Sequence, residues 1–570
     1  MNATKKLFLT ARLAIGDEQL LLLVAILIGV YSGLAVVGFR LAIEWLRLML
    51  LGSSLTPAFP RVPLVPAAAG LLVAAFVVLL FPAVRGSGVN QTKAALYIYD
   101  GYISFRTVIG KFLTSAIAIG SGQSLGPEDP SLQIGAGLAS ALGRQLNLSR
   151  EHMRYIAPIG AAAGLAAAFN SPITAVLFVI EEVIGRWTAG VLGAVVLSAV
   201  ASVVTEQWFL GDEPLFRVPP YHLAHGAELI AYAALGLIGG VISLVFVKSV
   251  AALRPRLRAL PPWTWYLQPA IAGLFVGGIG LRFPQVMGAG YEFIDQAMHD
   301  QYGWRILLAL CVLKVVTTTA SFVSGTPGGL FAPTLFIGAM LGGGVCAIER
   351  LVAPGITGPI GAYALVGMGT LFAGIIRAPM TSVFMIVEVS GNYSIILPVM
   401  ISNTIAYLVS RRFQEHALFD VLAAQEGTVL PSMEEERESD VHSVEDAMRD
   451  PTGMTFKGEE SLSTAVARAA QVPAAPYFIV DMGGGVWGGL SRAELEHLHD
   501  TSPHDAPLRT LVTPLAPPYL YPDQSTATAL RVLRGRPFVP VVHRADRTRL
   551  EGVLALDDVL RAVTGTEGIG

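Results

Sequence analysis

Charged side chains are scarce in this sequence, and their scarcity restricts the class of protein. Only 14% of the 570 residues are Asp, Glu, Lys or Arg, whereas 53% are hydrophobic. Soluble domains carry about 25% charged residues, so the composition excludes an ordinary soluble protein and indicates a chain that mostly faces lipid. The formal net charge is only −3, and without a basic patch we expect no nucleic-acid partner.

Cysteine is almost absent, and so are the common catalytic motifs. The two cysteines, Cys311 and Cys346, lie in apolar stretches and are typical of small core residues, not of a disulfide or a metal site. The apolar segments contain no nucleophile–base pair, no His-Glu metal motif and no phosphate loop, so we do not expect an enzyme. Metal-ligand spacing is also missing from the histidines of the C-terminal region, which are His497, His499, His504 and His543.

Long apolar runs, in contrast, recur from Leu20 to Leu408. Many are long enough to cross about 30 Å of hydrocarbon. Others are short or interrupted by Gly and Pro, which suits helices that end partway across the bilayer. Examples are Leu20–Val37, Ala67–Leu80, Val191–Val204, Leu229–Val247, Ile306–Phe322 and Tyr363–Ile376.

Composition predicts five parts of the chain. The N-terminal residues, with Lys5, Lys6 and Arg12, lack the cleavage site of a secretory signal. Arg411 and Arg412 follow the last apolar run, so the positive-inside bias places both ends in the cytoplasm, and we expect a cell-membrane protein. The expected parts are a cytoplasmic segment 1–17, a membrane domain 18–412, a polar linker 413–440 containing the acidic run 434–438, and two soluble domains, 441–499 and 500–570.

The membrane region contains an internal duplication. The segments Lys111–Ala136 and Lys314–Ala339 share a Lys, a Thr, a Ser-Gly pair, a Gly, a Pro, a Leu and an Ile-Gly-Ala at one constant offset. A second block follows at a slightly larger offset, where Gly160, Pro172 and Glu181 match Gly367, Pro379 and Glu388. Matching Lys, Pro and Glu are not explained by hydrophobicity alone. Paired Gly/Pro-interrupted segments in two halves of a membrane chain point to the site of the transported ion.

The segment Gly126–Pro130 carries the clearest chemical signal. Gly then Pro, with acids in the first turn, marks a helix N-terminus, whose free N–H groups and dipole attract anions. One interpretation is an ordinary capped helix. The other follows from the duplication, because Gly329–Pro333 places an uncharged helix start at the matching position. Two helix N-termini with a carboxylate on only one predict an anion pore containing a tethered anion, Glu128.

Two lysines, Lys111 and Lys314, lie at matching positions inside apolar segments. A charge there is costly and usually has a role. They either bias the interior potential toward anions or pair with carbonyl groups and nearby helix ends.

Several motifs together resemble the CLC family of chloride channels and transporters. The combination is specific even though each short motif alone is weak, and it covers roughly residues 14–423. The resemblance implies an all-α, polytopic membrane fold with an internal two-fold repeat, which we expect to be inverted, although the sequence itself does not distinguish inverted from parallel halves. The segments that carry it are Gly86–Val89, Gly126–Pro130, Gly329–Pro333, Ala168–Pro172 and Asn392–Tyr393.

The resemblance also implies roles for individual residues. Ser87 and the backbone amides of Leu330 and Phe331 would bind the central anion, and Phe419 occupies the position of an aromatic gate. Glu128 would be the gate and proton carrier. Glu182 would transfer protons on the inner side, and it matches Val389 in the second repeat, which is consistent with a recruited role. The alternative for Glu182 is an interfacial acid at a helix end.

Four residues depart from the family pattern. Pro127 and Asp129 replace the Arg and Gly that usually flank the gating Glu, Asn90 stands where Pro is common, and Phe419 lacks the hydroxyl of the usual Tyr. The second carboxylate, on Asp129, either points away from the anion path, or is protonated, or weakens anion binding. These departures bear on coupling and affinity more than on the fold.

The C-terminal region is predicted to contain two tandem α/β units. Phe478–Val480 and Gly488–Ser491 read as strand, turn and strand before a helix, and Phe538–Val542 with Gly552–Ala555 repeats that order. This region resembles a CBS-domain pair. The resemblance implies an adenine nucleotide near Ser491, Glu494 and Asp558, although Ala555 replaces a hydroxyl residue; a nucleotide-free dimerisation module is the alternative.

These observations lead to one functional prediction with two alternatives. We expect a homodimeric CLC-type protein that transports chloride in exchange for protons, with Glu128 and Glu182 as the proton-linked acids. Ser87 favours chloride over nitrate or fluoride. The alternatives are a passive voltage- or pH-gated chloride channel of the same fold and a membrane protein that senses nucleotide and conducts nothing.

Overall fold

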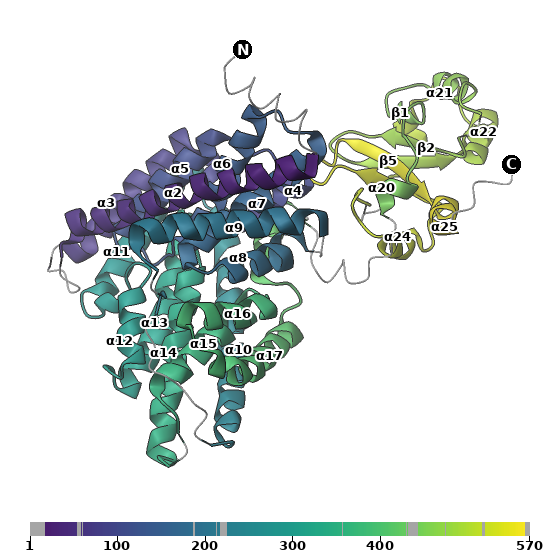
Figure 1. Cartoon of the computed structure of the whole chain (residues 1–570). Helices are drawn as coiled ribbons and strands as arrows, with labels where there is room; N and C mark the ends of the chain where they lie inside the picture. The colour runs from purple at the N-terminus through teal and green to yellow at the C-terminus, as the bar shows by residue number, and fades with distance from the viewer. Residues whose placement is uncertain are drawn as a thin grey trace. The chain divides into compact units, whose positions relative to one another are not determined.

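The computed structural model describes residues 17–53, 59, 61–185, 189–212, 214–216, 225–355, 357–428, 430, 443–473, 475–515 and 519–564. The expected N-terminal segment with Lys5, Lys6 and Arg12, and the acidic run at 434–438, lie outside these residues. The chain divides into two compact units between Glu426 and Gly427, and each is considered by itself (Figure 1).

The regular elements that the structure describes in the first unit are helices. Seven of the helices that the structure describes are long and apolar enough to cross a membrane, and shorter apolar helices lie between them. This confirms the all-α, multi-pass architecture. The helices of the first half are α2 (Asp17–Leu51), α3 (Arg61–Ala75), η1 (Phe76–Leu80), η2 (Pro82–Val84), α4 (Gly88–Tyr97), α5 (Phe105–Gly120), α6 (Glu128–Gln145), α7 (Arg150–Phe169), α8 (Pro172–Phe178), η3 (Val179–Ile184) and α9 (Ala189–Leu210).

The second half repeats this order of elements. Its helices are α10 (Glu228–Arg258), η4 (Pro262–Tyr266), α11 (Gln268–Gly280), η5 (Pro284–Val286), α12 (Tyr291–Met298), α13 (Trp304–Val323), α14 (Phe331–Val352), α15 (Ile360–Ile375), α16 (Pro379–Ser390), η6 (Tyr393–Ile395), α17 (Ile396–Phe413) and α18 (Leu418–Gln425). The duplicated segments therefore become α5–α6 and α13–α14, and the second block becomes α7–α8 and α15–α16.

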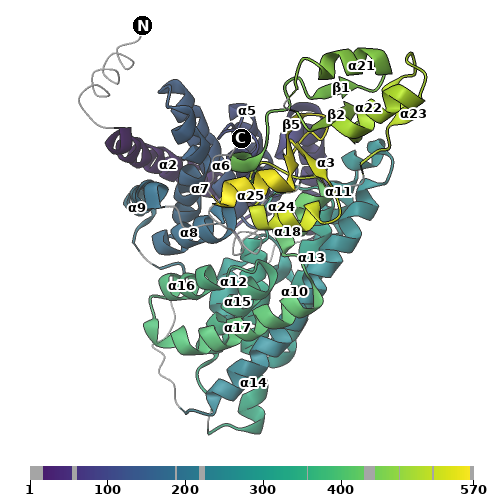
Figure 2. The same cartoon turned by 90° about the vertical axis from the view of Figure 1, so that its right-hand side faces the viewer.

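The two halves meet through pairs of matching elements. Helix α3 packs on α11, and α8 packs on α16. The two members of each pair lie side by side in both views (Figures 1 and 2). Between α6 and α14, the N–H of Gly126 donates to the carbonyl of Gly329 at 2.8 Å and the N–H of Gly329 donates back at 2.7 Å. This reciprocal antiparallel bridge joins equivalent positions of the repeats, as an inverted two-fold repeat requires.

Matching glycines let the helices of each half approach closely. A Cβ on Gly135 would lie 2.2 Å from the carbonyl oxygen of Gly160, and a Cβ on Gly338 would lie 2.2 Å from that of Gly367. A real Cβ atom cannot lie so close to a backbone oxygen, so the helices can approach this closely only where the residue is glycine. This explains why glycine recurs at equivalent positions of the α6–α7 and α14–α15 pairs.

The two intramembrane lysines have the same structural role in each half. Lys111 Nζ donates to the carbonyls of Val84 and Gly86, and Lys314 Nζ donates to those of Val286 and Gly288. Each lysine therefore fixes the loop that precedes a short helix, α4 or α12. Pairing with carbonyls, one of the two interpretations from sequence, is confirmed.

The second unit is a small α/β structure. Strand β1 (Thr455–Lys457) pairs in parallel with β2 (Tyr477–Asp481), β2 pairs antiparallel with β3 (Trp487–Ser491), and β4 (Phe538–Val542) pairs antiparallel with β5 (Leu550–Ala555). The expected strand–turn–strand–helix order is confirmed in both halves. The helices are α20 (Val444–Ala447), α21 (Leu462–Ala469), α22 (Arg492–Thr501), α23 (Leu508–Leu511), α24 (Thr526–Leu533) and α25 (Leu556–Thr564).

Candidate functional site: converging helix N-termini

The candidate site lies where the N-termini of α4, α6 and α14 come together beside the Gly126–Gly329 bridge. The first N–H groups of an α-helix have no acceptor within the helix, so each terminus presents free donors and a positive dipole end. Two carboxylates from the first turn of α6 reach the other two helices: Glu128 contacts α14 and Asp129 contacts α4.

Glu128 is completely buried. Its Oε2 accepts a hydrogen bond from the backbone N–H of Ala332 at 3.3 Å, in the first turn of α14. Its Oε1 has no hydrogen-bond partner among the residues that the structure describes. A buried carboxylate oxygen without a donor is energetically costly. Glu128 thus lies at the N-terminus of α14 with only one of its two carboxylate oxygens hydrogen-bonded to that helix.

Ser87 is the N-cap of α4, and its hydroxyl donates to Oδ1 of Asp129 at 3.0 Å. The N–H of Gly88 donates to Oδ2 and the N–H of Val89 donates to Oδ1, both at 3.0 Å. Of the arrangements considered for Asp129, the structure rules out a carboxylate that points away. Its side chain lies on the serine expected to bind the anion.

Aromatic rings gather beside these helix ends. Leu330 is the N-cap of α14, and Phe331, its first residue, is fully buried. The Phe331 ring stacks on Phe372 with centroids 5.5 Å apart and lies 6.1 Å from the ring of Phe419. Leu330, Phe331 and Phe419 are therefore brought together. These buried rings make the surroundings of the helix ends apolar, and a low dielectric strengthens each polar interaction there.

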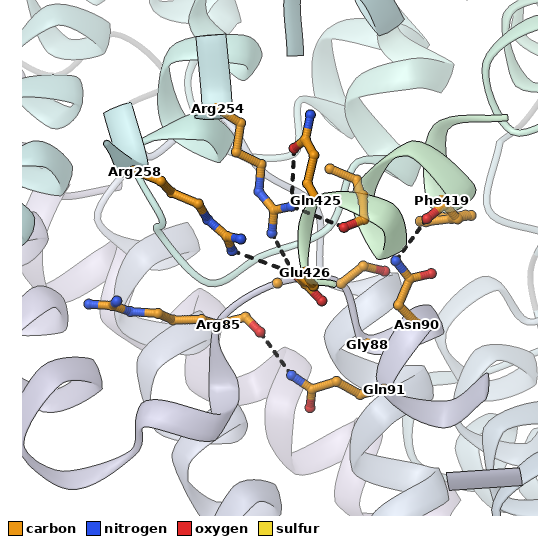
Figure 3. Close-up of polar contacts among 12 residues, drawn as sticks. Arg85, Gly88, Asn90, Gln91, Arg254, Arg258, Phe419, Gln425 and Glu426 are labelled. Carbon is orange, nitrogen blue, oxygen red and sulfur yellow. Dashed lines mark hydrogen bonds and ion pairs between the residues drawn. The ribbon is translucent and has the colours of Figure 1, made fainter. Parts of the chain in front are cut away.

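Helix α18, which carries Phe419, is anchored by polar contacts (Figure 3). Asn90 donates from Nδ2 to the carbonyl oxygen of Phe419 at 2.9 Å. At the other end of α18, Arg254 and Arg258 converge on Oε1 of Glu426, at 2.5 and 3.5 Å. Asn90 stands where proline is common, and its side chain joins α4 to the backbone of α18, a bond that proline cannot make.

Glu182 lies in the π-helical segment η3 beside Glu181. Its Oε1 accepts from Lys93 Nζ at 2.6 Å, and Asp420 Oδ1 lies 3.7 Å from the same nitrogen. Glu181 points instead to the first turn of α16, where its Oε2 accepts from the N–H and the hydroxyl of Thr381 at 2.9 and 2.8 Å. The adjacent acids therefore differ: one caps a helix and the other belongs to a buried charge cluster.

A cavity of about 400 Å³ lies against Pro127. Arg40, Arg47 and Glu292 are among its lining residues. Arg40 forms an ion pair of 2.7 Å with the buried Glu206, and Arg47 forms one of 2.7 Å with Glu44. Pro127 stands where arginine is usual, and the two arginines of α2 at the cavity beside it are each paired with a glutamate.

The residues proposed from sequence for a nucleotide have defined structural roles in the second unit. Ser491 and Glu494 form a reciprocal capping box at the start of α22. Asp558 accepts from Arg449 Nε at 2.8 Å, from the N–H of Ala555 at 3.1 Å and from Arg561 at 2.5 Å. No group of three or more potential metal ligands occurs among the described residues.

Sequence reasoning missed several residues of this site. Lys93, Asp420 and Arg40 were not singled out, and the amide that contacts Glu128 is that of Ala332, one residue beyond Phe331. Charges within apolar segments would have identified Arg40 and Glu206 as a candidate pair. For Lys93 no signal existed, because it lies in a polar stretch whose partner is far away in the chain.

Comparison with known proteins gives consistent results. The family described as voltage gated chloride channel matches residues 69–411. A putative chloride channel protein, ClcB-like, of Ralstonia nicotianae is 33% identical over 68% of this chain and 93% of its own length. An H⁺/Cl⁻ exchange transporter, ClcA, of Vibrio campbellii is 30% identical over 68% of this chain and 86% of its own length.

Solved structures show the same fold. A slow cyanobacterial Cl⁻/H⁺ antiporter superposes with a TM-score of 0.65 and 23% identity, over 71% of this chain and 97% of the other. A eukaryotic CLC transporter superposes with a TM-score of 0.64 and 22% identity, over 94% of this chain and 97% of the other, so the similarity of fold extends into the second unit.

Proposed function

The chain belongs to the voltage-gated chloride channel (CLC) family, and from that premise we propose that it exchanges chloride for protons across a cell membrane. Its relatives include proteins named H⁺/Cl⁻ exchange transporters. The observation that carries the proposal is the position of Glu128. Its carboxylate lies at the N-terminus of α14, where a halide would bind, and one of its oxygens lacks a hydrogen-bond partner among the described residues.

This position supports a simple exchange cycle. When Glu128 is charged, it competes with the anion for the amide groups of α14. When it takes a proton it loses its attraction for the helix dipole and leaves, and chloride enters between Ser87 and the amides of Leu330 and Phe331, with Phe419 closing the site. Return of the acid displaces chloride and releases the proton, which couples the two movements in opposite directions.

Glu182 is the proposed second proton carrier. Its carboxylate is buried with Lys93 and Asp420, and Asp420 is the most exposed of the three side chains at 25%. Asp420 therefore offers a path by which protons reach Glu182 from water. Lys93 keeps Glu182 from being an unpaired buried charge between proton transfers.

The remaining features of the proposal concern the whole protein. We propose a homodimer in the cell membrane. Both termini would lie in the cytoplasm, because Arg411 and Arg412 lie in the last turn of α17 and positive charges favour that side. The second unit would be a CBS pair. An adenine nucleotide near Ser491, Glu494 and Asp558 stays a prediction, and it would have to displace the caps that these side chains form.

Flux measurements in liposomes test the exchange proposal. In the wild type, chloride that moves down its gradient should drive protons in the opposite direction. The reversal potential of the wild type should also shift when a pH gradient is applied. Glu128→Gln should retain chloride flux and lose proton movement, and Glu182→Gln should do the same with less effect on chloride binding. Chloride should be preferred over fluoride and nitrate. A wild-type reversal potential that follows chloride alone would instead establish a passive channel.

A further inference from the structure

Two adjacent acids of α6 insert their carboxylates into two different helix N-termini. Glu128 reaches α14 through one amide at 3.3 Å, whereas Asp129 reaches α4 through two amides and a hydroxyl, each at 3.0 Å. Successive residues of a helix point about 100° apart, so neighbours can face different partners. By number and length of hydrogen bonds, Asp129 is the more firmly bound of the two anions.

We propose that the carboxylate of Asp129 is a second tethered anion of the transport path, which occupies the Ser87 position and must leave before a halide can bind there. The inference rests on the proposed function, because it takes Ser87 as a halide ligand. The hydroxyl of Ser87 can donate one hydrogen bond, and the carboxylate of Asp129 accepts it. As long as that bond exists, Ser87 cannot donate to a halide.

The fold does not need this carboxylate to cap the N-terminus of helix α4. Ser87 already caps the helix, because its Oγ accepts from the N–H of Val89 at 3.1 Å. The second repeat provides an internal comparison: α12 corresponds to α4 and begins after Gly290, and the position matching Asp129 is Ala332. The same helix thus forms in the other half without an acid at that position.

Glycines let the neighbouring helix ends approach Asp129 closely. A Cβ on Gly329 would lie 2.9 Å from the Cβ of Asp129, and a Cβ on Gly88 would lie 2.6 Å from the backbone oxygen of Asp129. A Cβ on Gly126 would lie equally close to the Cβ of Ala332, so the close approach belongs to both halves of the repeat. Glu128 on α6 and Lys111 on α5 are charged groups near the carboxylate, and Lys111 also interacts electrostatically with Glu426, which follows α18. Lys111 offsets the negative charge while its Nζ remains bonded to the Val84 and Gly86 carbonyls.

Chloride binding to the full-length protein in detergent, measured by isothermal titration calorimetry, tests the inference. All variants carry Glu128→Gln, so that Asp129 is the remaining competitor. Adding Asp129→Asn should tighten chloride binding about tenfold, because a neutral amide competes weakly with a halide for the same donors. Adding Ser87→Ala as well should abolish most of that gain. Glu388→Gln, which neutralises a carboxylate bound to a different helix N-terminus, should leave the affinity unchanged.

The outcomes separate the two proposals. Equal chloride affinity with and without Asp129→Asn, in protein that still passes chloride, overturns the inference alone, and so does a gain that persists with Ser87→Ala. Absence of chloride flux in every variant overturns the proposed function and this inference with it. Asparagine keeps a side-chain oxygen that can accept from the N–H groups of Gly88 and Val89, so the variant is expected to fold. If both Asp129→Asn and Asp129→Gly fail to give a monodisperse protein, Asp129 is a structural cap and the inference is wrong.

Discussion

Lys93 and Glu182 form a buried ion pair, with Nζ and Oε1 2.6 Å apart and only 4% and 10% of their side chains exposed. The two residues lie on α4 and η3, which are separated in sequence by α5 to α8. The pair joins the helix that Ser87 caps to the segment that contains both Glu181 and Glu182.

Removing Lys93 should therefore be costly. We expect Lys93→Met to destabilise the protein by about 3–5 kcal/mol, because it leaves Glu182 as an uncompensated buried charge. Thermal unfolding in detergent, followed by tryptophan fluorescence, measures the loss. The double variant Lys93→Met/Glu182→Gln should recover most of the stability. A double variant as unstable as the single one would mean that the pair is not the source of the effect.

The caps of α8 and α16 allow a paired experiment. Glu388 Oε2 accepts from the N–H and hydroxyl of Thr174 at 2.6 and 2.5 Å, and Glu181 makes the equivalent bonds to Thr381. Both glutamates are partly buried. We expect Glu181→Gln and Glu388→Gln each to cost about 1.5–3 kcal/mol, the range for hydrogen bonds to a charged group. Liposome assays should find the chloride-to-proton ratio unchanged in both. A changed ratio in Glu181→Gln alone would give that residue a role in proton transfer.

Phe419 permits a gain-of-function experiment. Its ring is 2% exposed and lies beside Phe331. Phe419→Tyr adds one hydroxyl donor, and a hydrogen bond to an ion contributes about 1.5–3 kcal/mol, so chloride should bind about tenfold or more tightly. Calorimetric titration with chloride measures the change. Phe419→Leu, which keeps the site apolar, should give no gain; equal affinity of the tyrosine variant and the wild type would place position 419 away from the anion.

The matched glycines predict where the membrane domain tolerates no side chain. Gly135→Val and Gly338→Val should both prevent folding, because their Cβ atoms would lie 2.2 Å from a backbone oxygen of the neighbouring helix. Gel filtration of detergent-extracted protein detects the loss of the monodisperse peak. Gly38→Ala on α2 is the control, since a Cβ there meets nothing within 4 Å, and alanine favours a helix by about 1 kcal/mol over glycine. A folded Gly135→Val protein would show that α6 and α7 can separate.

Local patterns in the sequence determined the architecture. Apolar run lengths, Gly and Pro at helix ends and the repeated Lys, Pro and Glu predicted a duplicated, multi-pass helical domain, and the C-terminal pattern predicted two runs of strand, turn, strand and helix. Both occur in the structure, whereas the boundary between 499 and 500 stays a prediction. They were predictable because hydrophobic burial and helix termination depend on residues only a few positions apart. The position of Glu128 at a helix N-terminus was predictable from the sequence for the same reason.

Only the tertiary structure decided which side chains meet. The sequence left three possibilities open for Asp129, and the packing of α6 against α4 rules out a carboxylate that points away, because the side chain accepts a hydrogen bond from Ser87. It likewise paired Lys93 with Glu182 and Asn90 with the Phe419 carbonyl, across separations of 89 and 329 residues. Such contacts depend on how helices from distant parts of the chain are oriented against one another, and nothing in the neighbouring residues of either partner records that orientation.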